Sequence, residues 1–166
     1  GVAVDEERQR VYVADARKHA ILVFDTTGKK IAEYAKGPGA EEGQLYMPSN
    51  LALGSDGTIY VSDGGNFRVQ VFSPEGEFLR TWGKIGDTPG TFARPKGIAL
   101  DSEDHVYVID AAFNNIQIFR KDGQLLLWLG QASEKPGGFL LPSTLSIDDQ
   151  DRIYVIQQED PVVQVF

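Results

Sequence analysis

Short apolar segments follow one another along the chain in a fixed order. After a proline comes an apolar run such as "LAL" or "IAL", then a polar turn, and then a segment that reads "VYVAD", "IYVSD", "VYVID" or "IYVIQ". A five-residue loop leads to an alternating segment such as "VQVF" or "IQIF", and a glycine turn leads to a fourth segment such as "EFLRTWG". These segments have the length and the β-branched and aromatic composition of strands, without helical periodicity. The pattern therefore predicts units of four short β-strands.

The order repeats at a nearly constant interval. Two aromatic series mark it, each with intervals of 48, 47 and 47 residues: Tyr12, Tyr60, Tyr107 and Tyr154, and Phe24, Phe72, Phe119 and Phe166. The motif Gly-x-Φ-x-x-Pro keeps the same register at Gly43–Pro48, Gly90–Pro95 and Gly137–Pro142. A period in this range is typical of repeat architectures. We therefore divide the chain into units of about 1–47, 48–94, 95–141 and 142–166 within a single domain.

The fold class that fits these units is all-β, and the architecture is a β-propeller of four consecutive blades, the last one incomplete with three strands. A four-stranded sheet cannot bury both of its faces alone, whereas a blade packs against a neighbour on either side. This explains why "IYV" is apolar at consecutive positions rather than at alternate ones. A β-sandwich gives no reason for the constant interval.

Parts of each unit resemble the NHL repeat, namely Pro-x-x-[Leu/Ile]-Ala-[Leu/Val], [Ile/Val]-Tyr-Val-x-Asp and Arg-Val-Gln-Val-Phe. The second unit is the most similar, at Asp63, Asn66, Arg68, Val69, Gln70, Val71 and Phe72. The resemblance covers the whole chain and implies a six-bladed ring of about 280 residues, of which this segment is expected to be a part. The Pro- and Gly-rich connectors and the "DAAFNN" stretch resemble bacterial NHL proteins, many of which are exported. An extracytoplasmic location, periplasmic or at the cell surface, follows as an expectation.

Composition narrows the classes of partner and chemistry. The formal charge of −8 disfavours nucleic acid as a partner, because its phosphates would be repelled. No apolar run is long enough to form a membrane-spanning helix. The absence of cysteine excludes disulfides, thiolate metal sites and a cysteine nucleophile.

Several recurring residues are interpreted as structural. Asp15, Asp63 and Asp110 end the second strand of three units and are expected to accept hydrogen bonds from the amides of the following loop. The loop glycines are expected to permit a positive φ. The third-strand glutamines, Gln70, Gln117 and Gln164, are expected to bond neighbouring strands or blades.

The two aromatic series are expected to anchor the core, together with the aliphatic residues of the third strand. Phe72 is placed in the same phase as Val69 and Val71, and Phe119 in the same phase as Ile116 and Ile118. Trp82 and Trp128 are interpreted as packing residues between outer strands, with an aromatic platform for a sugar as the alternative.

We expect no cofactor and no metal. Gly83, Gly86 and Gly90 look like a loose phosphate loop, but the same connector recurs elsewhere and no helix follows it. His19 and His105 are expected at opposite faces, so they cannot share a metal ion. The acidic turns "DSED" and "DDQD" lack the pattern of a calcium loop and are interpreted as solvated turns.

Variable loops on a fixed scaffold favour a non-catalytic protein-binding function. The loops between the second and third strands have constant length but different tips, which we take as the partner-binding face. Unit by unit, these tips are Arg17, Lys18 and His19, then Phe67 and Arg68, then Phe113, Asn114 and Asn115, then Glu159 and Asp160. The competing interpretation is that Phe67 and Phe113 fold onto neighbouring loops and serve only as connectors.

Two other functions stay open. The first is a propeller enzyme of the lactonase or lyase kind with a metal in its central channel, held by blades outside this segment. The channel-side positions here supply few anionic ligands, since they are Ser49, Asn50, Lys96, Gly97, Ser143 and Thr144. The second is RNA binding, as in some NHL domains, which the acidic charge disfavours.

Overall fold

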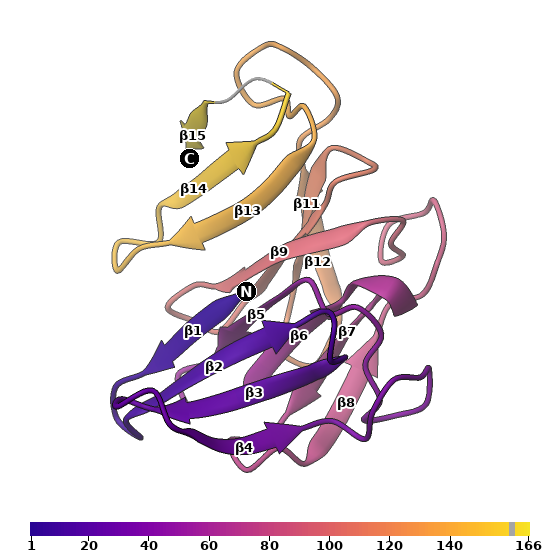
Figure 1. Ribbon diagram of the computed structural model, residues 1–166. Helices are drawn as coiled ribbons and strands as arrows, with labels where there is room; N and C mark the ends of the chain where they lie inside the picture. The colour runs from indigo at the N-terminus through magenta and orange to yellow at the C-terminus, as the bar shows by residue number, and fades with distance from the viewer. Residues whose placement is uncertain (160–161) are drawn as a thin grey trace.

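The computed structural model describes residues 1–159 and 162–166 and consists of β-strands joined by turns and loops (Figure 1). The first blade contains β1 (Val2–Asp5), β2 (Arg10–Asp15), β3 (Ala20–Asp25) and β4 (Lys30–Tyr34). The second contains β5 (Asn50–Leu53), β6 (Ile59–Asp63), β7 (Arg68–Phe72) and β8 (Phe78–Trp82), with the short 3-10 turn η1 (Gly64–Asn66). The third contains β9 (Pro95–Leu100), β10 (Val106–Asp110), β11 (Asn115–Phe119) and β12 (Leu125–Leu129). The fourth contains β13 (Pro142–Ile147), β14 (Ile153–Gln157) and β15 (Val163–Val165).

Each blade is an antiparallel meander whose strands pair in sequence order. The first strands of the blades, β1, β5, β9 and β13, lie side by side about a common axis, and the later strands of each blade lie progressively further out (Figure 1). This arrangement confirms the predicted β-propeller architecture. The described residues contain no helix that is long and apolar enough to span a membrane.

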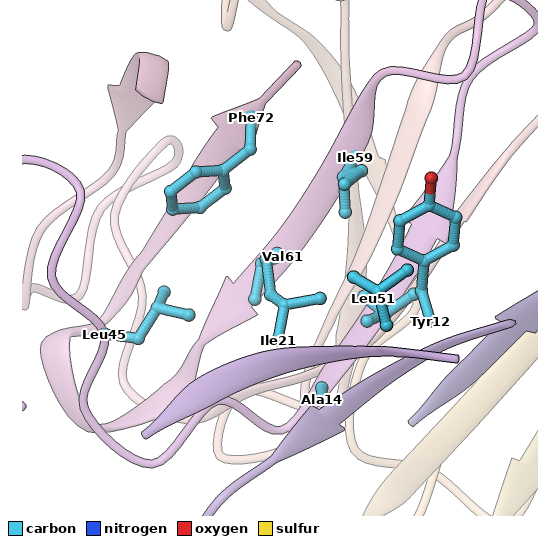
Figure 2. Close-up of a cluster of buried hydrophobic side chains, with 9 residues drawn as sticks. Tyr12, Ala14, Ile21, Leu45, Leu51, Ile59, Val61 and Phe72 are labelled. Atoms are coloured by element: carbon cyan, nitrogen blue, oxygen red, sulfur yellow. The ribbon is translucent and has the colours of Figure 1, made fainter. Parts of the chain in front are cut away.

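The core consists of three apolar layers, one between each pair of neighbouring blades. The layer between the first two blades contains Tyr12 and Ile21 from one blade and Leu51, Ile59 and Phe72 from the other (Figure 2). Consecutive strand residues point to opposite faces, so a blade needs apolar residues on both. The packing of each blade against two neighbours thus explains the continuous apolar runs of the sequence.

The phase expected for the third strand was wrong. Val69 and Val71 pack between the second and third blades, whereas Phe72 packs between the first and second. Strict alternation along "RVQVF" requires this, because Phe72 is adjacent to Val71 and therefore points to the other face. Phe119 is likewise separated from Ile116 and Ile118. Phe72 and Phe119 are each 1% exposed, whereas Phe166 is 43% exposed and Phe24 is half-buried.

The connectors between blades (35–49, 83–94 and 130–141) fold back on themselves. Each is closed by an isolated parallel bridge, at Pro38–Leu45, Ile85–Phe92 and Ala132–Phe139. The second member of each pair is fully buried, and it is the apolar residue of the Gly-x-Φ-x-x-Pro motif. The apolar residue of the motif therefore anchors each connector in the core. The anchored connectors support the loops between the second and third strands.

Candidate interaction face

The loops between second and third strands lie against the connectors that enter the same blades. Backbone hydrogen bonds join them: Gly65 N donates to Tyr46 O at 2.8 Å, Ala111 N to Arg94 O at 3.0 Å, and Gln158 N to Leu141 O at 3.1 Å. These loops and connectors therefore form one continuous surface, which we call the connector face. The polar turns between first and second strands, such as 101–105, lie at the opposite end of the strands.

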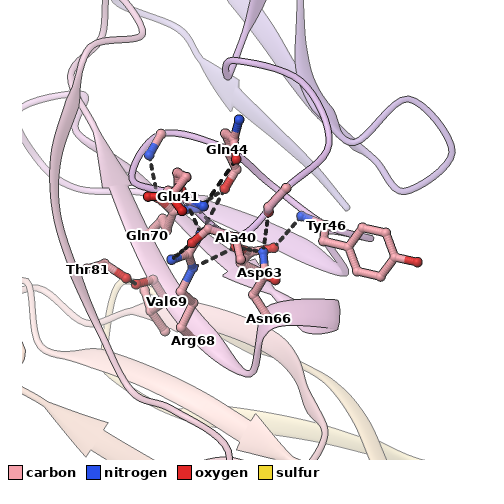
Figure 3. Close-up of polar contacts among 12 residues, drawn as sticks. Ala40, Glu41, Gln44, Tyr46, Asp63, Asn66, Arg68, Val69, Gln70 and Thr81 are labelled. Atoms are coloured by element: carbon pink, nitrogen blue, oxygen red, sulfur yellow. Dashed lines mark hydrogen bonds and ion pairs between the residues drawn. The ribbon is translucent and has the colours of Figure 1, made fainter.

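A dense hydrogen-bonded cluster holds the second blade's part of this face together (Figure 3). The fully buried carboxylate of Asp63 pairs with Arg68 Nε at 2.9 Å and also accepts from Asn66, Gln70 and the amide of Tyr46.

The guanidinium group of Arg68 reaches back to the connector. It donates to the carbonyl oxygens of Ala40, Glu41 and Gln44 at 2.8 to 3.0 Å, and its side chain is only 12% exposed. Charge-assisted hydrogen bonds of this kind are stronger than neutral ones. Arg68 therefore lies on the predicted face, but its guanidinium group is already hydrogen-bonded within the protein.

The loop glycines serve a purpose other than the expected one. Gly64 and Gly65 do not have positive φ, whereas Phe67 does, at 57°. A Cβ atom on Gly65 would lie 2.3 Å from the Tyr46 ring and 2.6 Å from its carbonyl oxygen. The expectation of a positive φ was therefore wrong, since glycine is needed for the close approach of the connector.

Three residues in the loops contact the neighbouring blade. His19 Nδ1 accepts from the amide of Met47 at 3.0 Å, and its ring stacks on Tyr46 with centroids 5.0 Å apart. Asn114 Oδ1 accepts from the amide of Leu141 at 2.7 Å. Phe67 packs against the apolar layer between the second and third blades. All three side chains thus make contacts within the protein, and for Phe67 this is the contact expected if its loop is a connector.

The loop aspartates differ in how they bond. Asp15 Oδ1 accepts from the amides of Arg17 and Lys18, as expected for a capped turn. Asp110 accepts from the loop amides of Ala112 and Phe113 and also from the connector amides of Ala93 and Arg94. Asp63 accepts from no backbone amide of its own loop. The later aspartates thus bind the connector, which the sequence did not reveal.

The third-strand glutamines act on the connectors in the same way. In each of three blades the side chain accepts from a connector glycine amide and donates to the next carbonyl oxygen. The pairs are Gln70 with Gly43 and Gln44, Gln117 with Gly90 and Thr91, and Gln164 with Gly137 and Gly138. The glutamines are structural, as expected, but they mainly hold the connector, and among these bonds only that of Gln70 with Asp63 joins a neighbouring strand.

The other described residues of the predicted face are accessible. Arg17 and Lys18 on the first blade and Glu159 on the fourth are exposed. Phe113 and Asn115 are half-buried and line a cleft on the third blade. Asp160 lies outside the described residues. The accessible part of the face is thus basic at the first blade, aromatic at the third and acidic at the fourth.

Among the positions that the sequence places beside the channel, Ser49 contacts backbone carbonyl groups. Ser49 Oγ lies within hydrogen-bond distance of the carbonyl oxygens of Ser62, Pro95 and Lys96. The pKa of Lys96 is below its usual value because burial penalises the ammonium ion and Arg94 lies nearby.

Within residues 1–159 and 162–166, no group of three or more His, Asp or Glu side chains is placed to hold a metal ion.

Titratable side chains at the opposite end are coupled to each other. Asp101 accepts from the ring of His105 at 2.9 Å and from the hydroxyl of Tyr107 at 3.1 Å. Burial works to raise the pKa of Asp101, but hydrogen bonds from His105, Glu103 and Tyr107 together lower it. Burial, followed by the charge of Asp101, raises the pKa of Tyr107 to about 12. His19 and His105 lie at opposite faces, as expected.

Comparisons with known proteins place the fold. The NHL repeat matches residues 45–72. Peptidylglycine alpha-amidating monooxygenase of Rattus norvegicus is 30% identical over 103 residues, covering 56% of this chain and 10% of that protein. Its Mus musculus counterpart is 28% identical over 103 residues, with the same coverage of both proteins. The chain thus spans about a tenth of the length of these curated relatives.

Solved structures with the same architecture have low sequence identity. A streptogramin B lyase structure superposes with a TM-score of 0.70 at 15% identity, covering 100% of this chain and 53% of that one. A nidogen/laminin complex gives 0.70 at 22% identity, covering 95% and 56%. At these identities the likeness shows the fold alone. The chain is therefore a β-propeller that carries an NHL repeat in its second blade.

Proposed function

We propose that the protein is a non-catalytic scaffold that binds a protein partner on its connector face. The observation that carries this proposal is that some loop residues form hydrogen bonds within the protein, whereas others are exposed on its surface. Arg68, His19 and Asn114 bond the fold, whereas Arg17, Lys18 and Glu159 project from it. Exposed charges of opposite sign at the two sides of one face would orient a partner during its approach. The proposal includes further blades that complete a six-bladed ring, and an extracytoplasmic location.

Charge reversal on the connector face tests the scaffold function. Arg17→Glu with Lys18→Glu should slow association with the native partner and weaken binding about tenfold at low salt, because steering charges act mainly on the association rate. The matched control reverses Lys29 and Lys30, which are exposed on the same blade at the opposite end of the strands. The partner is isolated by crosslinking in the native source and then titrated in purified form. Equal effects of both double variants would contradict the proposal.

A propeller lyase is the second candidate, because solved structures of streptogramin B lyase and virginiamycin B lyase share the fold over the whole chain. In this case the metal would be held by blades beyond residues 1–166. Elemental analysis of the purified whole protein separates the two functions. Stoichiometric zinc or calcium, lost together with activity on chelation, would favour the enzyme over the scaffold.

A further inference from the structure

The third blade has a cleft of about 340 Å³ on the connector face. It is bounded by connector residues 87–89 on one side and by Phe113, Asn115 and Gln117 on the other. The indole of Trp128, which is 54% exposed, forms part of its wall. The cleft lies on a blade that has a neighbour on each side.

In the second blade, the position equivalent to this cleft is filled by the side chain of Arg68. Asn115 corresponds to Arg68, because each is the first residue of its third strand and pairs with the aspartate that ends the second strand. The guanidinium group of Arg68 lies on the connector, bonded to the carbonyl oxygens of Ala40 and Glu41 (Figure 3). The corresponding connector residues in the third blade, 47 positions later, are Asp87 and Thr88. Asn115 is too short to reach them, so the cleft opens where a guanidinium group lies in the second blade.

Three features of the cleft suit a cation. Asp87 adds an exposed carboxylate where the second blade has Ala40. Trp128 adds an aromatic face where the second blade has Thr81, since these residues pair with Gln117 and Gln70. Indole is the side chain that binds cations best through its ring face.

The third feature is an acceptor within the cleft wall. Asn115 Oδ1 is buried and accepts no hydrogen bond from the protein among the described residues. A buried acceptor without a donor is destabilising. A guanidinium group carries five N–H donors in a planar fork, so after a rotation of the Asn115 side chain that brings this closed oxygen into the cleft, it can donate to this oxygen and to a connector carbonyl group together. A lysine ammonium group is a compact point charge and cannot span them in this way.

We propose that this cleft binds the side chain of an arginine presented by the partner protein, in the place that Arg68 fills in the second blade. The proposal rests on the proposed scaffold function and names the chemistry of one contact. The arginine would stack on Trp128, pair with Asp87 and donate to the carbonyl oxygens of the connector. The partner thereby completes in the third blade the cluster that the second blade makes by itself.

The direct test uses a small probe in place of the partner. N-acetyl-arginine amide is titrated against the whole protein, with Trp128 fluorescence and the NMR signals of the Asn115 side chain as readouts. The matched probe is N-acetyl-citrulline amide, which keeps the shape but lacks the charge. We expect the arginine probe to bind at least tenfold more tightly. Equal binding of the two probes, or binding of a neutral sugar in competition with arginine, would overturn the proposal.

Variants locate the binding in the cleft. Asn115→Arg supplies the internal guanidinium of the second blade, so it should abolish probe binding without loss of folding. Trp128→Thr, which copies Thr81, should weaken binding about tenfold and remove the fluorescence response. Gln158→Arg is the matched control, since it adds the same side chain at an exposed position of the same face. Probe binding that survives Asn115→Arg would show that the cleft is not the site.

The probe also separates this proposal from the scaffold function. If partner binding depends on Arg17 and Lys18 but the arginine probe does not bind, the scaffold stands and the cleft proposal fails. The probe could also bind in the cleft while partner binding is unchanged both by Asn115→Arg and by charge reversal at Arg17 and Lys18. In that case the scaffold proposal fails at this face. The cleft would then be an arginine site without the proposed protein partner.

Discussion

At the scale of single residues, Arg68 stabilises the second blade by joining a buried carboxylate to its connector. Arg68→Met should lower the free energy of unfolding by about 3 kcal/mol, because it leaves the buried carboxyl group of Asp63 without its ion-pair partner. The control is Arg120→Met, whose ion pair with Asp122 is more than half exposed on both sides and should contribute about 0 to 1 kcal/mol. Urea denaturation of the whole protein measures both. A similar loss of unfolding free energy in the two variants would mean that burial does not make the Asp63–Arg68 ion pair more stabilising than an exposed one.

The raised pKa of Tyr107 predicts that part of the stability depends on pH in the alkaline range. Its pKa of about 12 in the folded state exceeds the value of about 10 in an unfolded chain, so folding favours the neutral form. The stability from this group is present below pH 10 and is lost as the pH rises from about 10 to 12. Tyr107→Phe should flatten the fall in unfolding free energy over that range, while lowering stability at pH 7 because Asp101 loses a donor.

Urea denaturation at several pH values checks this, with tyrosinate absorbance reporting the titration. The control is Tyr46→Phe, which removes a hydroxyl group from a ring that is 44% exposed and leaves Asp101 and Tyr107 in place. An unchanged slope in Tyr107→Phe would assign the alkaline loss to other residues.

Residue positions could be predicted from the sequence where the repeat itself carries the information. The interval placed Phe72 and Phe119 in equivalent sites, and both are buried. The partners of Arg68 could not be predicted, because its carbonyl acceptors are 24 to 28 residues away along an irregular connector. The same holds for Gly65, whose purpose depends on the path of Tyr46.

At the scale of elements, the polar turns link neighbouring blades. The carboxylate of Asp104 accepts from both the amide and the hydroxyl of Ser55, and that of Asp151 accepts from the same groups of Ser102. Both aspartates have positive φ, near 60°. The sequence analysis interpreted these segments as solvated turns and did not predict the hydrogen bonds between them, because the donors lie 49 residues away in the preceding unit. Strands and tight turns follow from local patterns, whereas contacts between turns follow from how the blades stack.

Removing one such link should have a measurable cost. Asp104→Ala should lower the free energy of unfolding by about 1 kcal/mol, since two hydrogen bonds to a charged group are lost at an exposed site. Glu103→Ala is the adjacent control, because its side chain is 78% exposed and lies 3.8 Å from His105 at closest. Thermal and urea denaturation of both variants should separate them. Equal stability would mean that solvent replaces the Ser55 contact at no cost.

At the scale of the whole molecule, the outward faces of the first and fourth blades are apolar. Val2 and Val4 on the first blade and Ile156, Val163 and Val165 on the fourth are 46% to 63% exposed. The inner blade faces of the same molecule are covered by neighbouring sheets. Exposed apolar patches of this kind mark surfaces that another layer covers, which is consistent with the proposal of additional blades.

Residues 1–166 produced alone should therefore self-associate, because two apolar blade faces and the open edge of β15 would be in contact with water. Analytical ultracentrifugation over a range of concentrations measures this. Ile156→Lys with Val163→Lys should shift the material towards monomer, since these changes charge the fourth blade's outward face. Leu79→Lys is the control: Leu79 is 46% exposed but lies on the outer strand β8 of an internal blade, so its replacement should leave association unchanged. A monomeric 1–166 that melts cooperatively would show that the four blades are sufficient without further covering of these faces.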